Sequence, residues 1–469
     1  MALPGHTTST FRYRFFCIFF CLFMSTRSPN AFRIAQLPRM LANTKIYQSR
    51  LENTPLSIPD LLTLACLALA PLCFLSVRSW TIFFVFLLIL VAAWELFHIR
   101  HSFTILRDHK AAQWIVVTLA SSFLAVLVGE LLRGHMQVGL LDGPSRPLLA
   151  VLLFVYLLHK PIDFVRLLEW SAPISLFILS CLLWIHPYDF VNISSGRFGT
   201  VAVDPLTLGQ YGTLLGFICL FTLNLYGPDD LVLKLLKIMG ILMALWISVG
   251  TASRSGWAAV PALLVIWVVH VQKIRKPQKI FWMLLGFGLL GFALCKLIPV
   301  VGERVGLAAT EYVAYLHGGS HDTATGLRIS LLRAAGLLFL EQPLFGYGDT
   351  NYPALSSIPA IASFSTDALQ FAVVHNGVHN EIMQSALRSG IFGLVSSVLM
   401  FTVPAVVFYR GCASAVPSVR AAGLVGLCYT VAVFCFGLST ETFNLKYTIS
   451  FYALMVSALA AQVLRPQPI

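Results

Sequence analysis

Titratable residues and glycines meet at one junction of this chain, directly before an apolar segment. The stretch reads His375-Asn-Gly-Val-His379-Asn-Glu-Ile-Met-Gln-Ser-Ala-Leu-Arg388-Ser-Gly390-Ile-Phe-Gly393. A histidine exchanges a proton near neutral pH and can therefore act as a general base toward a hydroxyl group. The junction is a candidate active site, in which His379 or His375 would accept the proton.

The residues that follow His379 have the spacing of a helix. From Asn380 onward, the polar residues Asn380, Gln384 and Arg388 fall on one face at four-residue intervals. We expect this face to point at a cavity or at water. Gly390 and Gly393 would let the helix kink, or pack closely on a neighbour, before the span proper. The plainer interpretation is that both histidines only precede a span, and their spacing lacks the third ligand of a metal site.

Arginines in turns are the second group of candidates. Arg197 lies in Ser-Gly-Arg-Phe-Gly, and Arg254 lies in Ser-Arg-Ser-Gly-Trp between two apolar segments. Arginine at a membrane boundary is costly unless it pairs with an anion, and guanidinium groups suit bidentate phosphate binding. Two or three such contacts, at about 1.5 to 3 kcal/mol each, could hold a diphosphate. Snorkelling toward lipid headgroups is the plain alternative. Arg328 is a weaker third candidate.

The composition places these residues in a membrane protein. Of 469 residues, 58% are hydrophobic and 11% are charged, whereas charged residues make up about 25% of soluble proteins. The net charge of +12 comes from basic residues dispersed between apolar runs. Dispersed charge disfavours a nucleic-acid partner and suits orientation among membrane lipids. Most cysteines lie inside apolar runs, so neither disulfides nor a zinc site is indicated.

Twelve segments have the length and apolarity of membrane-spanning helices. They are residues 61–77, 80–97, 112–132, 147–159, 170–186, 206–226, 238–252, 255–270, 280–300, 382–408, 420–438 and 447–463. We therefore predict an all-α polytopic integral membrane protein with about 12 transmembrane helices and one large periplasmic loop containing amphipathic helices. The expected divisions are an N-terminal extension, cytoplasmic or poorly ordered, at 1–60, spans 1 to 9 at 61–300, the loop domain at 301–381, and spans 10 to 12 with a short cytoplasmic tail at 382–469.

The distribution of lysine predicts the orientation. Alternate loops hold several lysines, including Lys110, Lys160, Lys234 and Lys273, whereas the opposite set holds the single lysine Lys446. Because short basic loops stay in the cytoplasm, both termini should lie inside, and the candidate residues should face outward.

The large loop should contain an amphipathic helix. From Gly326 to Leu340, apolar residues repeat three and four positions apart, and the pattern stops at Gln342-Pro343. Such a helix can lie on the membrane plane and wall a cavity.

The order of these motifs resembles the O-antigen ligase family of bacterial inner membranes, within a superfamily that includes O-antigen polymerases. The resemblance covers roughly residues 190–395 in motifs and 60–465 in topology. It rests on the Arg197 turn, Ser-Arg254-Ser-Gly-Trp, Leu-Arg328-Ile, Pro343-Leu-Phe-Gly-Tyr-Gly348, and His379-Asn380 with Gly390 and Gly393.

The resemblance implies a multi-pass glycosyltransferase of the bacterial inner (cytoplasmic) membrane. It would move an O-antigen glycan from undecaprenyl diphosphate to the lipid A core oligosaccharide at the periplasmic face, with no cofactor and no metal. By matching position, His379 would be the general base, and Arg197, Arg254 and Arg328 would bind the donor diphosphate. His375 and Asn380 would be supporting residues. Direct displacement by the acceptor would invert the anomeric centre.

Other functions stay open at this point. An O-antigen polymerase would use the same lipid-linked donor, and a protein-glycosylating oligosaccharyltransferase is a more distant alternative. A lipid or solute transporter is the alternative from a different class. Transporters place charged sites near mid-membrane in broken helices, whereas the candidates here gather at one face, which favours an enzyme. The second pair, His375-Asn376, leaves the base open between two histidines, although the spacing to Gly390 and Gly393 favours His379.

Overall fold

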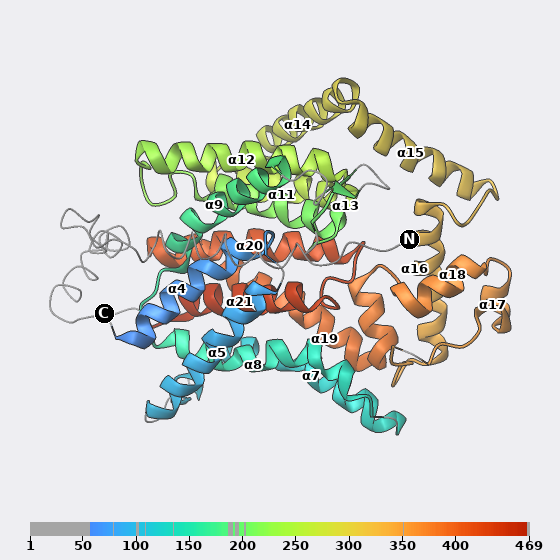
Figure 1. Cartoon of the computed structure of the whole chain (residues 1–469), viewed down its shortest axis with the longest axis horizontal. Coiled ribbons are helices and arrows are strands. Elements are labelled where there is room, and N and C mark those ends of the chain that lie inside the picture. Colours follow the sequence, from blue (N-terminus) through green and yellow to red (C-terminus); the bar gives the residue numbers. More distant parts are fainter. Residues whose placement is uncertain are drawn as a thin grey trace, which may run out of the picture. The chain divides into compact units, whose positions relative to one another are not determined.

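The structure is a computed structural model that describes residues 57–77, 79–99, 103–107, 109–134, 136–185, 191–192, 197–200, 203–349 and 351–466. Figure 1 shows that these residues are helical almost throughout. The compact helical unit starts at Ile58. Of the extension predicted at 1–60, residues 1–56 lie outside the described ranges.

The elements follow one another as membrane helices interrupted by short connections. In the first half they are α4 (Ile58–Cys73), α5 (Trp80–His98), α6 (Thr104–Arg107), α7 (Lys110–Arg133), the 3-10 turn η1 (Val138–Leu141), α8 (Asp142–Leu158), α9 (Phe164–Ile185), β1 (Val191–Asn192), β2 (Arg197–Phe198), α11 (Pro205–Thr222) and α12 (Leu231–Thr251). In the second half they are α13 (Arg254–Ile266), the π-helix η2 (Trp267–Val271), α14 (Pro277–Leu297), α15 (Pro299–Leu316), α16 (Ala324–Glu341), η3 (Leu355–Ser357), α17 (Pro359–Ala362), α18 (Asp367–Phe371), the π-helix η4 (Ala372–Asn376), α19 (Glu381–Cys412), α20 (Pro417–Gly437) and α21 (Lys446–Leu464).

The predicted fold class is confirmed. Eleven described helices are long and apolar enough to cross a membrane, and α4 is a shorter apolar helix. The sequence predicts the fourth span at 147–159, but α8 starts at Asp142 and continues from η1. The polar residues Asp142 and Arg146 lower the hydropathy of this first turn, so the apolar pattern does not include it in the predicted span. In the structure the two side chains form an ion pair at 2.9 Å. Asp142 also pairs with Lys446 at the start of α21.

Three helices form the centre of the bundle. In the most apolar stretches of α11, α20 and α21, between 78% and 83% of the residues are buried. Figure 1 shows α20 and α21 between α5 and α8 on one side and α9, α11 and α12 on the other, with α4 drawn across them. Small side chains on α21, such as Ala453 and Ser457, allow this close packing. Ser457 donates to the carbonyl of Ala150 on α8 at 3.2 Å.

The helix α14 has the opposite character. None of its residues, all of which are described, is buried within the protein. Large side chains such as Phe281, Trp282 and Phe292 are exposed along it. A helix that is apolar all round and packs on little protein is suited to lipid contact on most sides.

The loop before α19 folds into a helical layer with its own core. The amphipathic helix predicted at 326–340 is confirmed as α16, and it buries one face. That core contains Leu331, Ala334, Ala335, Leu338, Leu355, Ile361, Leu369, Ala372 and Val373, among others. The layer is therefore a packed unit with α16 on one side and the short helices α17 and α18 on the other (Figure 1).

A bend in α19 fastens this layer to the bundle. The kink that the glycines predict occurs at Ser389 and Gly390, which leave helical geometry. The bend frees backbone carbonyls, and the N–H of Tyr347 donates to the Leu387 carbonyl at 2.7 Å. The N–H of Gly348 donates to the Arg388 carbonyl at 3.1 Å. The loop segment thus replaces helical hydrogen bonds that α19 gives up.

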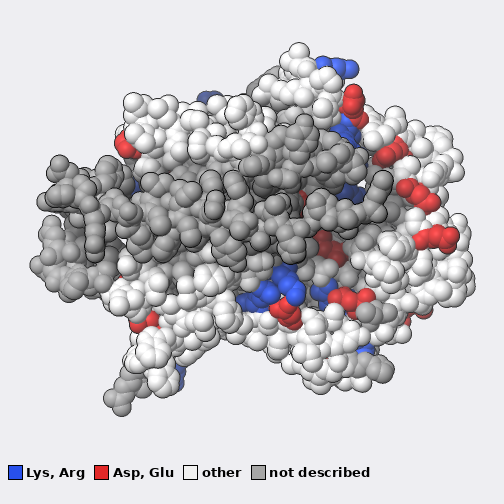
Figure 2. Space-filling view, viewed as in Figure 1, with Lys and Arg blue, Asp and Glu red and all other residues white. Residues whose placement is uncertain are grey.

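The connections between successive membrane helices form two sets, which lie at opposite ends of the bundle. We call the end that carries residues 134, 136–142, 197–200, 203–204, 251–254, 298–349, 351–380 and 438–446 the site end. Contacts such as Tyr447 donating to Asp204 at 3.5 Å join its segments. Figure 2 shows that the charged side chains visible on one face gather toward this end, while the sides of the helices are largely uncharged.

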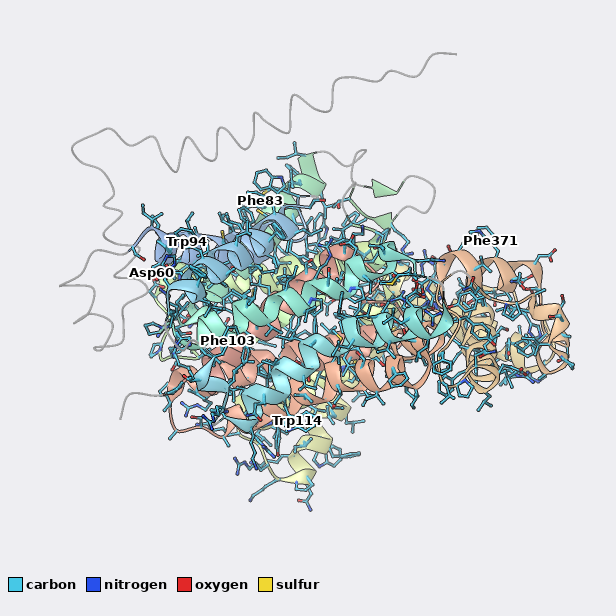
Figure 3. The ribbon with its side chains drawn as sticks, turned by 90° about the horizontal axis from the view of Figure 1, so that it is seen from below. Asp60, Phe83, Trp94, Phe103, Trp114 and Phe371 are labelled. Carbon is cyan, nitrogen blue, oxygen red and sulfur yellow. The ribbon has the colours of Figure 1, made fainter. Side chains whose placement is uncertain are left out.

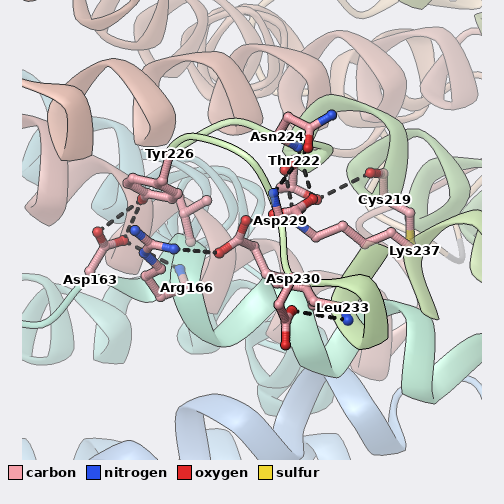
Figure 4. A network of polar contacts seen from close by, with 12 residues as sticks. Asp163, Arg166, Cys219, Thr222, Asn224, Tyr226, Asp229, Asp230, Leu233 and Lys237 are labelled. Atoms are coloured by element: carbon pink, nitrogen blue, oxygen red, sulfur yellow. Dashed lines mark hydrogen bonds and ion pairs between the residues drawn. The ribbon is translucent and has the colours of Figure 1, made fainter. Parts of the chain in front are cut away.

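A buried ion network holds the opposite end together (Figure 4). The Lys237 ammonium group is fully buried and donates to Glu169 at 2.7 Å and to Asp229 at 3.0 Å. It also donates to the Thr222 carbonyl at 2.8 Å. These contacts join α9, α11 and α12 at one point. A buried charge is tolerated only when its partners surround it in this way.

We predict that Lys237→Met destabilises the folded protein by about 3 to 5 kcal/mol, because Glu169 and Asp229 would stay buried without their counter-ion. Equilibrium unfolding in detergent measures the loss. The matched control is Lys234→Met on the same helix, because Lys234 is exposed and should change stability little. Equal stability of the two variants would contradict a role of the network in holding these helices.

Candidate functional site

Three short segments that are distant in sequence each bring one arginine to the site end. Arg197 lies on β2, which pairs antiparallel with β1 in a two-stranded ribbon. No strand is predicted from the sequence around Arg197. The Arg197 Nε donates to the carbonyl of Thr251 at the end of α12, at 2.7 Å. This bond uses one donor of a half-buried guanidinium group and fixes its direction.

Arg254 is the first residue of α13, directly after a tight corner. Ala252 and Ser253 make the corner, with Ala252 in a left-handed conformation at φ 47 and Ser253 only 1% exposed. The corner sits against α11 at Gly209, where an added Cβ would lie 2.4 Å from the Cβ of Ser253. Only glycine allows this approach of two backbones. The Arg254 Nη1 points toward the Thr325 hydroxyl on α16, at 3.5 Å.

Arg328 on α16 and Arg304 on α15 complete a cluster of four arginines. The pKa of Arg197 is lowered by burial and then by the positive charges of Arg304, Arg254 and Arg328. Likewise, burial and the charge of Arg254 lower the pKa of Arg328. Arginine side chains stay protonated at any ordinary pH, so the lowered pKa values indicate that several positive charges lie close together. Two carboxylates act in the opposite direction. Asp204 raises the pKa of Arg197, and Glu311 raises the pKa of Arg328.

His379 occupies a turn that is fixed by its own backbone. Its φ is 52, a left-handed conformation that is uncommon outside glycine. The N–H of His379 donates to the carboxylate of Glu441 at 3.2 Å, and the N–H of Val378 donates to Gln384 at 3.1 Å. Next to it, Gly377 has φ 75, and a Cβ there would lie 1.8 Å from the Glu441 carboxylate. The backbone therefore turns tightly around one buried acid.

The electrostatics of His379 favour a neutral imidazole. Burial lowers its pKa, and the positive charge of Arg328 lowers the pKa further. Both effects penalise the protonated form, so the ring is free to accept a proton at neutral pH. The same effect shows that the imidazole lies within electrostatic reach of Arg328. A base and a group of cations thus share one end of the bundle.

Glu441 is a residue that the sequence analysis misses. It lies in the short connection between α20 and α21, is 9% exposed, and also accepts from the Asn444 side chain at 3.1 Å. Burial, followed by the negative charge of Glu381, raises its pKa to about 7. A lone glutamate in a short polar connection gives little signal in sequence. Arg304 is missed for a similar reason, because basic residues in long loops are common.

The polar face predicted on α19 is correct, but its surroundings differ from the expectation. Gln384 is 4% and Arg388 is 9% exposed, because residues 344–349 and Tyr352 cover them. Arg388 donates to Asp349 at 2.7 Å and to Asn444 at 3.1 Å. Beside it lies a cavity of about 30 Å³, also lined by Glu381 and Ser389. A cavity of this size holds water and excludes a sugar ring.

The supporting residues take separate places. Asn380 caps α19, because its side chain accepts from the N–H of Met383 at 3.1 Å. His375 is exposed, and its Nδ1 lies 3.1 Å from the carbonyl of Phe371. Arg333 is also exposed and lies over the ring of Phe364, at 4.4 Å from the ring centre. Within the described part of the chain, no three His, Cys, Asp or Glu side chains gather in a way that could hold a metal ion.

Comparison with known proteins points to one family. Residues 239–398 match the sequence profile of the family described as O-antigen ligase. This region of the chain is similar to that family. The matched region runs from within α12 to within α19, so it contains Arg254, Arg304, Arg328 and His379. Arg197 and Glu441 lie outside it, and the fold brings both back to this region.

A curated relative extends the likeness beyond the O-antigen ligase region. A Haemophilus influenzae protein, described as an uncharacterized protein, is 22% identical over 278 residues. The alignment covers 57% of this chain and 65% of the relative. The chain therefore spans slightly less than two thirds of the length of that relative.

We predict that Glu441→Gln changes how the stability of the protein depends on pH. A carboxyl group whose pKa is raised from 4.5 to about 7 stabilises the fold fully below pH 4.5 and loses this contribution as the pH rises through 7. Thermal unfolding of both proteins in detergent between pH 5 and pH 8 tests this. The stability of the variant relative to wild type should rise with pH. His379 titrates in both proteins, so it cancels in the difference, and parallel curves would contradict the prediction.

Proposed function

We propose that the protein is a glycosyltransferase that moves an O-antigen glycan from undecaprenyl diphosphate to the lipid A core oligosaccharide. The reaction would take place at the periplasmic face of the bacterial inner membrane, without a metal ion and with inversion at the anomeric carbon. The feature that carries the proposal is the placement of His379 and of Arg197, Arg254, Arg304 and Arg328 at one end of a membrane bundle, where burial and Arg328 lower the pKa of His379. The match of residues 239–398 to the O-antigen ligase profile supports the reaction class.

The chemistry of transfer to a hydroxyl matches these groups. The imidazole of His379 would accept the proton of the acceptor hydroxyl while that oxygen bonds to the anomeric carbon of the donor glycan. The bond from that carbon to the diphosphate oxygen breaks in the same step, and the diphosphate leaves with the electron pair. Arg197, Arg254 and Arg328 would stabilise the departing charge. Attack opposite the leaving group inverts the anomeric centre.

The cluster of like charges supports an anionic ligand in particular. Four guanidinium groups repel one another, while Asp204 acts on Arg197 and Glu311 acts on Arg328 in the opposite direction. A diphosphate would relieve this repulsion and accept bidentate hydrogen bonds from the arginines. The same argument disfavours a simple transporter, because the charges lie at one end of the bundle and not at the middle of the spans.

An O-antigen polymerase remains the second candidate, since it would use the same donor with a growing lipid-linked glycan as acceptor. The family match is compatible with the wider superfamily. The residues that bind a diphosphate and accept a proton would serve both reactions. The two functions therefore differ in the acceptor, and the product distinguishes them.

Reconstitution tests the function directly. The purified protein in lipid vesicles receives lipid-linked glycan and lipid A core in the presence of a chelator, and the products are separated by size. We expect glycan on lipid A, independent of the chelator. Longer chains on the carrier would establish the polymerase, and the absence of both products would refute a glycosyltransferase. In this assay, His379→Ala should abolish transfer while donor binding persists.

The pH profile of the same reaction checks the role of His379. Because burial and Arg328 lower the pKa of His379, transfer should decline only below the ordinary histidine value of about 6.5. His375→Ala is the matched control and should keep most of the turnover at saturating substrate, because its ring lies outside the anchored turn. Full activity of His379→Ala, or loss of turnover confined to His375→Ala, would remove His379 as the base.

We predict that Arg197→Ala and Arg254→Ala each weaken binding of the lipid diphosphate by roughly tenfold to a hundredfold, as expected for one lost charge-assisted contact. Binding of undecaprenyl diphosphate to the purified protein measures the effect. Arg333→Ala is the control, because Arg333 lies on the same helix as Arg328 but stacks on Phe364. If all three variants bind like wild type, the arginines do not bind the diphosphate.

A further inference from the structure

We propose that Phe371 and His375 form a sugar-binding platform beside His379, on which one pyranose ring of a substrate stacks. This inference rests on the proposed function, because it assigns a place to the glycan that the reaction moves or extends. The two rings are stacked, with centroids 4.4 Å apart and planes inclined by 17°. Both side chains are exposed, and Phe371 is 57% exposed.

The exposure of Phe371 contrasts with its surroundings. Six phenylalanine and tyrosine rings lie in the described residues 317–349 and 351–380, and the other five are buried or half-buried. Figure 3 shows Phe371 at the outer edge of the layer that contains α16 to α18. Single exposed apolar residues are common, so exposure alone carries no argument. The ordered partner of this ring is what distinguishes it.

The local backbone accounts for the pairing. The stretch from α18 into the π-helix η4 buries Leu369, Ala372 and Val373 against the core of the layer. Phe371 and His375 lie on the opposite side and are therefore directed outward. The Nδ1 of His375 lies 3.1 Å from the Phe371 carbonyl, which fixes the plane of the imidazole. Single-turn π-helices often occur at functional sites.

This arrangement has the chemistry of sugar recognition. The faces of aromatic rings carry negative charge density, and one face of a pyranose presents polarised C–H groups that match it. Because the Nδ1 of His375 contacts a carbonyl, its Nε2 is the ring atom directed to an outside ligand, where it can bond to a hydroxyl. An apolar ligand would use an outer ring face alone, whereas a sugar would use an outer ring face together with this nitrogen.

The position relative to His379 fits the proposed reaction. The two histidines are four positions apart in the chain, so their Cα atoms lie within about 14 Å of each other even in a fully extended chain. Gly377 and the Glu441 contact hold the turn between them. A sugar on the platform would therefore lie within a short oligosaccharide of the hydroxyl that His379 deprotonates. It would belong either to the acceptor core or to the donor glycan.

The test compares Michaelis constants for the two substrates in detergent and in vesicles. We expect Phe371→Ala to raise KM for one substrate by roughly threefold to tenfold, with little change in kcat, because stacking contributes to binding and not to proton transfer. A raised KM for lipid A core assigns the platform to the acceptor, and a raised KM for the lipid-linked glycan assigns it to the donor. Phe371→Trp should restore the wild-type KM, and His375→Ala should raise the same KM.

Phe83→Ala is the matched control, because Phe83 on α5 is similarly exposed at 54% and lies well apart from Phe371 in Figure 3. An unchanged KM for both substrates in Phe371→Ala, in a preparation whose wild type transfers glycan, overturns the platform and leaves the proposed function intact. A rise that occurs in vesicles but not in detergent identifies Phe371 as a lipid anchor and also overturns it. Absence of transfer by wild type is the failure of the proposed function itself.

Discussion

The bend of α19 at Ser389 and Gly390 is the constraint on which the site depends. A bent helix leaves backbone carbonyls without their usual partners, and unpaired carbonyls near a membrane are costly. The protein satisfies them with the N–H groups of Tyr347 and Gly348 and with the guanidinium of Arg133, which donates to the Arg388 carbonyl at 2.9 Å. The helical layer is therefore bonded to the bundle at the bend, where these carbonyls need donors. The helix α16, which carries Arg328, also contacts Arg254 through Thr325.

Charge is concentrated at this end at a cost to stability. The four arginines repel one another, and the acid that holds the His379 turn is buried deeply enough to take a proton near pH 7. Groups placed in this way stabilise a bound transition state more than they stabilise the empty protein, because they need no rearrangement when charge develops. The buried network around Lys237 at the other end is different. Its charges pair with one another, which offsets the cost of burying them, and none is left for a ligand.

Local patterns in the sequence predict the helices, the amphipathic α16, the kink at Gly390 and the candidate residues His379, Arg197, Arg254 and Arg328. The signal for each of these features lies within one short segment of the sequence. It is a periodicity, a glycine, or a charge in an apolar setting. Glu441 and Arg304 are not predicted, because their importance arises only when α15 and the connection before α21 come to the same place. The burial of Arg388 under residues 344–349 is missed for the same reason, since a polar helical face does not reveal what covers it.

The environment of Glu441 separates its role from that of His379. Burial raises the pKa of Glu441 to about 7 and lowers the pKa of His379, so either group could exchange a proton in solution. The carboxylate oxygens of Glu441, however, already accept from the His379 backbone and from Asn444, and the side chain is 9% exposed. A hydroxyl group of a substrate has no comparable access to it. Glu441 is therefore placed to hold the left-handed turn, and the half-buried imidazole of His379 is the group left to meet a substrate hydroxyl.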